Sequence, residues 1–131
     1  MAGSKTDYLE NKVLDAVLNN TSLVVATPYV ALFTATPSDS GGGTEVTGGS
    51  YARAVSTTSW PAASGGSCAN DVAIAFPTAT ANWGTVSQFA IMDASTAGNM
   101  LYWGDLTTPR TINNGDPTPT FAIGALVITE G

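Results

Sequence analysis

The residues most able to do chemistry in this chain are its ten carboxylates, which are scattered and fall mostly at predicted turns. Asp93 and Asp105 flank a predicted hairpin, and paired-carboxylate hydrolysis needs two acids on facing elements. Asp93 with Asn99 offers oxygen ligands for calcium, although the chain has no EF-hand or nonapeptide repeat. Because Asp and Asn also form turns by bonding their own backbone, we interpret all three as turn residues and predict no catalytic or metal residues.

Other catalytic patterns are incomplete. The chain has no histidine for general base work or zinc, and Cys68 is its one cysteine. Gly41 to Gly43 resemble part of a phosphate-binding loop, but neither a lysine nor a helix follows them. Four basic and ten acidic residues give a net charge of −6. That balance argues against nucleic acid and anionic membranes as partners. We predict a protein that is not an enzyme and has no cofactor.

The stretch 85–93 predicts a central strand, because Val86, Phe89 and Ile91 alternate with smaller or polar residues. The alternation slips once between Val86 and Phe89, which indicates a bulge. Residues 28–34 are nearly all apolar, as in a strand covered on both faces. Further strands are predicted at 50–55, 72–76, 99–106 and 120–129, with a turn at 93–99. We expect a mainly β fold, an antiparallel sandwich or barrel of about six to eight strands with one N-terminal amphipathic helix.

The helix is predicted over residues 4–20, with Ser4 as N-cap and Asp7 completing a capping box. Its apolar residues recur at three- and four-residue spacing and form one stripe. That stripe either covers the sheet or packs on a neighbouring subunit. We expect residues 1–131 to form a single domain, with the helix at 4–20 and the β-domain at 28–129.

Glu45 and Arg53 are the natural ion pair of this charge-poor chain, since Arg53 is one of two arginines. A bidentate arginine–carboxylate bond would fix the loop geometry; a surface contact with a partner is the alternative role for Arg53. Candidate partner-contact surfaces are the helix, the loop 36–50 and the loop 59–69. The contact residues predicted on them are Leu9, Val13, Ser40, Gly42 and Trp60.

The order of several segments resembles a family of short tailed-bacteriophage virion proteins, often labelled tail-fibre proteins. These segments are Tyr8-Leu9-Glu10, residues 29–34, Glu45-Val46, Gly48 to Arg53, residues 74–77, residues 79–86, Asp93-Ala94 and Gly98-Asn99. The resemblance covers nearly the whole chain and carries no catalytic residues. The chain is also similar in size, acidity and composition to head decoration (cement) proteins, which commonly act as trimers.

The resemblance implies a virion structural protein, assembled in the host cytoplasm, whose partners are other virion proteins such as the major capsid protein or tail proteins. It also implies a homo-oligomer such as a trimer. We expect foremost a decoration protein that stabilises the outer head lattice. The alternatives are a tail-fibre or tail-tip component contacting the host receptor, with Trp60 or Trp103 stacking on sugar, and a small glycan-binding module.

Overall fold

A computed structural model describes residues 3–25 and 27–130. Within them lie one helix and ten strands, and every strand pairing is antiparallel. The mainly β fold class with one N-terminal helix is therefore confirmed. Six strands form the main sheet in the order β1-β8-β7-β2-β3, with β4 also pairing to β2. These strands are β1 (Gly3–Lys5), β2 (Tyr29–Ala35), β3 (Thr44–Glu45), β4 (Ala54–Val55), β7 (Gly84–Met92) and β8 (Met100–Ile112).

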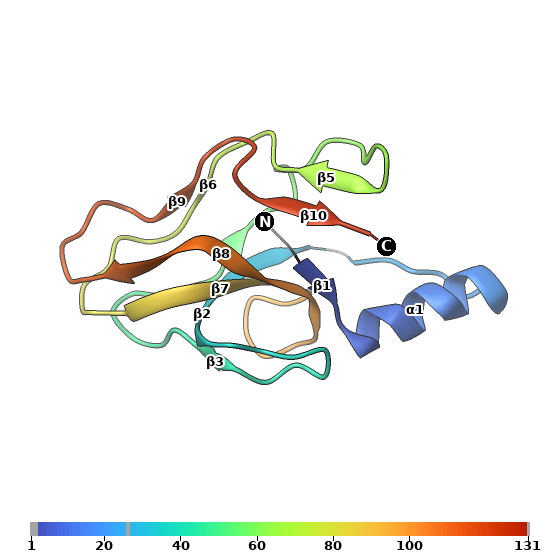
Figure 1. The fold of residues 1–131 in the computed structure, drawn as a ribbon, viewed down its shortest axis with the longest axis horizontal. Helices are drawn as coiled ribbons and strands as arrows, with labels where there is room; N and C mark the ends of the chain where they lie inside the picture. Colours follow the sequence, from blue (N-terminus) through green and yellow to red (C-terminus); the bar gives the residue numbers. More distant parts are fainter. Residues whose placement is uncertain (1–2, 26, 131) are drawn as a thin grey trace.

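Two short ribbons complete the β-structure. The first pairs β5 (Ser67–Ala69) with β10 (Val127–Thr129), and the second pairs β6 (Ile74–Ala75) with β9 (Thr120–Phe121). Figure 1 shows both ribbons on the same side of the main sheet. The sandwich thus consists of one continuous sheet and two small ribbons. Its strands are more numerous and mostly shorter than the sequence predicts.

The predicted central strand is confirmed as β7, which lies between β8 and β2. Its register with β8 shifts between Val86 and Gln88, where the sequence indicates a bulge. Val86, Phe89 and Ile91 are 1%, 0% and 5% exposed. The bulge lets all three face the same side although their spacing is uneven.

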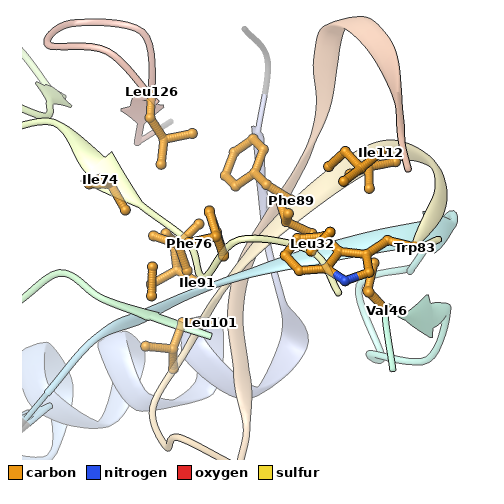
Figure 2. Close-up of a cluster of buried hydrophobic side chains, with 14 of the residues drawn as sticks. Leu32, Val46, Ile74, Phe76, Trp83, Phe89, Ile91, Leu101, Ile112 and Leu126 are labelled. Atoms are coloured by element: carbon orange, nitrogen blue, oxygen red, sulfur yellow. The ribbon is translucent and has the colours of Figure 1, made fainter. Parts of the chain in front are cut away.

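The main hydrophobic core lies between the sheet and the ribbons. Figure 2 shows side chains from β2, β7, β8 and the ribbon segments meeting there. A second, smaller cluster consists of Ala31, Phe33, Ala90, Met92 and Met100. Because alternate residues of a strand point to opposite faces, the two clusters bury β2 on both faces, as its near-continuous apolar sequence predicts.

The helix α1 (Asp7–Leu18) is shorter than the predicted 4–20, and its N-cap is Thr6 rather than Ser4. Residues 3–5 are held in β1, where Ser4 pairs with Trp103, so the helix begins only after them. The Thr6 hydroxyl accepts a hydrogen bond from the Leu9 amide and donates one to the Met100 carbonyl at 2.6 Å. The predicted N-cap was therefore wrong by two residues, and the predicted capping box is absent, because the residue three positions after Thr6 is Leu9.

The apolar stripe of α1 covers the body of the protein only near the start of the helix. Leu9 is buried and Val13 is partly buried against the core, whereas Leu14, Val17 and Leu18 are 54%, 73% and 73% exposed. Figure 1 shows α1 projecting away from the sheet. The interpretation that the stripe covers the sheet is wrong for its C-terminal half.

The predicted strand 120–129 is interrupted by a turn. Gly124 has a φ of +78°, and the Ala125 amide bonds to the Ala122 carbonyl. The regular alternation of a continuous strand is lost at this turn, since Ile123 is 69% exposed while Leu126 is fully buried. It is stabilised by a residue distant in sequence, Asn70, which is 1% exposed.

Other predicted boundaries also shift. The predicted strands at 50–55 and 72–76 shrink to β4 and β6, and β5 lies inside the predicted loop 59–69. The strand returning from the 93–99 turn, predicted at 99–106, continues as β8 to Ile112. Pro109 is accommodated because β8 shifts register against β7 beside it and leaves it exposed.

Candidate functional site: the Glu45–Arg53 cluster and two grooves

Glu45 and Arg53, which the sequence pairs, form a bidentate ion pair in the structure. The Arg53 Nη2 atom lies 2.8 Å from Glu45 Oε1, and Nε lies 2.9 Å from Oε2. The Arg53 side chain is 7% exposed and that of Glu45 is 22% exposed. Two parallel charge-assisted bonds at this depth fix the relative orientation of β3 and the segment containing Arg53.

Arg53 also binds a third segment. Its Nη1 atom donates to the carbonyls of Ala94 and Ala97 at 2.7 and 2.8 Å. The guanidinium thus ties β3 to the turn between β7 and β8. A partner molecule would have to displace these bonds to use Arg53 as a contact, so the structural role accounts for this side chain.

The turn between β7 and β8 is also stabilised by hydrogen bonds between its own residues. The Asp93 carboxylate accepts bonds from the Asn99 backbone amide at 2.7 Å and from its side-chain amide at 3.0 Å. Gly98 has a φ of +75°, and a Cβ there would lie 2.6 Å from Asp93 Oδ1, so the turn requires glycine. Asp105 lies opposite Gln88 in the sheet, away from Asp93, and its Oδ1 atom accepts a hydrogen bond from Gln88 Nε2 at 3.1 Å. The two acids that the sequence placed at one hairpin are therefore not brought together.

Tyr51 is the site residue that the sequence analysis missed. Its hydroxyl donates to Glu45 Oε2 at 2.7 Å and accepts from the Leu32 amide at 3.0 Å. Its ring packs edge-on against Trp83, at 5.3 Å between ring centroids. The available signal was spacing, because residues i and i+2 of an extended segment point to the same side. The Tyr-Ala-Arg motif thus directs both Tyr51 and Arg53 to Glu45.

These contacts shift the pKa values of the cluster. Burial by itself would raise the pKa of Glu45, but the hydrogen bonds from Arg53 and Tyr51 outweigh it and hold that pKa below its ordinary value. The pKa of the Tyr51 phenol is raised, mainly by burial, so its hydroxyl stays protonated and can donate to Glu45. The hydrogen bond to Glu45 raises the pKa of Arg53 more than burial lowers it.

A pH prediction follows from the lowered pKa of Glu45. A depressed folded-state pKa contributes stability that is present above the unfolded value, here 4.5, and is lost as the pH falls through the folded value. We expect the free energy of unfolding to fall on acidification from pH 7 to pH 3. The Glu45→Gln variant should be less stable at pH 7 but should lose less on acidification. Urea unfolding at pH 7 and pH 3 measures the free energy of unfolding of both proteins. The control is Glu10→Gln, a change at an exposed position of the helix. An equal loss of stability between pH 7 and pH 3 in Glu45→Gln and wild type would contradict the prediction.

A groove of about 640 Å³ with both polar and apolar lining residues adjoins this cluster, and Glu45 and Arg53 are among the residues that line it. Its walls are the first turn of α1, the loop 39–43 and the turn 97–99, and its floor includes Phe33, Met92 and Met100. Ser40 and Gly42, two predicted contact residues, line this groove. Among the residues that the structure describes, no group of three or more His, Cys, Asp or Glu side chains could hold a metal ion.

An apolar groove of about 340 Å³ lies at the base of α1. The predicted contact residues Leu9 and Trp60 line it, Leu9 as a buried residue of its floor. Leu9 also packs into the main core, so it exposes little of its own surface to a partner. The Trp60 indole N–H donates to the Ser56 hydroxyl at 3.2 Å, and that of Trp103 donates to Asp39 at 3.2 Å. Both rings are only partly exposed.

Comparison with known families identifies the chain's relatives. A family model described as Podophage GP4 fiber I protein gp80 matches residues 4–129. The chain belongs to this family. The match confirms the resemblance to virion proteins of tailed phages labelled as fibre proteins. A search of curated proteins found no match. Over the described ranges 3–25 and 27–130, no helix has both the length and the apolar composition needed to cross a bilayer.

Proposed function

We propose that this protein is a structural component of the phage fibre and acts by contacts with other virion proteins. The observation that carries the proposal is the fibre family model, which matches from residue 4 to residue 129 and so spans the helix and every ribbon of the fold. The acidic net charge of −6 agrees with protein partners, because binding to nucleic acid depends on basic residues.

The geometry of the Glu45–Arg53 cluster supports a structural rather than a catalytic role. Arg53 makes four hydrogen bonds, and all of them hold protein segments together. Asp93 is engaged with Asn99, and Tyr51 with Glu45 and the Leu32 amide. Because these side chains are occupied by hydrogen bonds within the chain, they are not available for proton transfer. The cluster instead holds the loops in a fixed conformation. We propose no cofactor.

The family description supports a fibre position rather than the head decoration that the sequence analysis favoured. Quantitative mass spectrometry of purified particles separates the two. A fibre component should be present in far fewer copies than the major capsid protein, whereas a decoration protein that repeats with the symmetry of the head should approach the number of capsid subunits. A copy number that approaches that of the major capsid protein would overturn the fibre proposal in favour of decoration.

The surroundings of the two tryptophans predicted to stack on sugar do not favour glycan binding. Trp60 and Trp103 are partly buried, and their indole N–H groups are satisfied within the chain. A stacking platform for a glycan needs an accessible ring face. We therefore propose assembly contacts, and not receptor recognition, as the main role of this domain.

A further inference from the structure

The projecting helix α1 and the segment returning from it, residues 19–25, form an arm with an uncovered apolar surface. Leu14, Val17 and Leu18 lie at positions i, i+3 and i+4, so they form one ridge along the helix. They are 54%, 73% and 73% exposed, and Leu23 and Val24 on the returning segment are 41% and 82% exposed. Packed helices in soluble domains normally bury such a ridge.

The outer part of the arm lacks charged side chains. No charged residue occurs from Ala16 to Ser38, although the whole chain carries a net charge of −6. Depletion of charge is typical of the core of a protein–protein interface. Charge is therefore scarce where two copies would meet, and the nearest carboxylate on the arm is that of Asp15, beside Leu14.

The surface complementary to the ridge is present on the same chain. The apolar groove at the base of α1 is lined by Leu23, Val25, Trp60, Cys68 and Ile128 among others. Leu23 belongs both to the arm and to the groove, so the two surfaces are continuous. The described part of this chain thus carries both a projecting apolar ridge and an apolar hollow beside it.

We propose that the occupant of the groove is the arm of a second copy of this chain, in a two-fold exchange of arms. A two-fold interface requires a self-complementary surface, and a ridge next to a groove on one chain satisfies that requirement. This proposal goes beyond the fibre assignment and does not depend on it.

The area available fits a weak pair. Only the part of α1 from Leu14 to Leu18 carries the exposed ridge; it is about 7.5 Å long, and half of its lateral surface at a diameter of about 11 Å is roughly 130 Å². Exchange buries one ridge and one groove on each copy, so on the order of 500 Å² in total by the same estimate, to which Leu23 and Val24 of the returning segment add. Such an area is typical of weak, transient contacts, and we expect a dimer that forms only at high concentration and dissociates on dilution.

Sedimentation of the purified chain over a range of concentrations tests the association. We expect wild type to shift from one to two chain masses as concentration rises. Val17→Asp and Leu18→Asp should each weaken the dimer at least tenfold without unfolding the chain, since both side chains are already 73% exposed. Ile123→Asp, at a 69% exposed position outside the arm, is the matched control and should associate as wild type.

A disulfide test identifies the contact. Cys68 is the one cysteine of the chain and lies in the groove. In the Leu14→Cys variant, oxidation should give a covalent dimer, and Cys68→Ser added to that variant should abolish it. Ile123→Cys should give none. A chain that stays monomeric at all concentrations, or a Val17→Asp variant that dimerises like wild type, would overturn the proposal. Because neither assay uses particles, such a result would leave the fibre assignment standing.

Discussion

Replacing Arg53 by alanine is expected to lower the free energy of unfolding by about 3 kcal/mol, and Tm by roughly 10 °C. The substitution leaves the Glu45 carboxylate without its bidentate partner and two turn carbonyls, those of Ala94 and Ala97, without their donor. Removing one member of a largely buried pair is costly because the other charge remains in a poorly solvated position. Chemical denaturation monitored by tryptophan fluorescence measures the loss.

Two matched variants separate geometry from charge. Arg53→Lys keeps the charge but cannot form the paired bonds, so we expect about half of the loss. Arg110→Ala removes the other arginine, which is exposed on β8, and should change stability by less than about 0.5 kcal/mol. Equal losses for Arg53→Ala and Arg110→Ala would mean that the Glu45–Arg53 cluster does not hold the loops.

The second large effect is expected at Asn70. Its side-chain amide donates to the carbonyls of Val72 and Ala122, both at 3.0 Å, and its carbonyl oxygen accepts from the Leu126 amide at 3.0 Å. Asn70→Ala removes all three bonds at a residue that is 1% exposed. We expect a loss of about 3 kcal/mol, since each buried backbone group left unpaired costs about 1–3 kcal/mol.

Hydrogen exchange locates the effect of Asn70→Ala. The amides of Leu126 and of β10 should lose protection, because they depend on the turn that Asn70 supports, whereas those of β7 should exchange only through global unfolding. Asn11→Ala, at an exposed helix position, is the control and should be nearly neutral. Unchanged exchange at Leu126 in the Asn70→Ala variant would show that the turn does not need this side chain.

The parts of the fold that could be predicted from sequence are those determined by local pattern. The alternation of Val86, Phe89 and Ile91 predicted β7 and its bulge, and the continuous apolar run predicted that β2 is buried on both faces. Residue scarcity also helped with Glu45 and Arg53, since a chain with two arginines offers few partners for a carboxylate.

The parts that could not be predicted depend on contacts between distant segments. Asn70 acts 52 and 56 residues away, on Ala122 and Leu126, and no local signal marks the strand break it supports. The helix N-cap is Thr6 and not the predicted Ser4, because β1 pairs with β8, which lies nearly a hundred residues later in the chain. Periodicity found the apolar stripe of α1 but could not say what covers it, since a stripe facing a sheet and a stripe facing another molecule have the same spacing.

We propose that this chain is a structural part of the phage fibre. Immunogold electron microscopy of intact particles, with antibodies raised against the purified chain, tests it most directly. We expect gold particles along the tail appendages and none over the head. Labelling spread over the head surface would contradict this proposal. So would purified particles that show no labelling and contain no detectable amount of the chain.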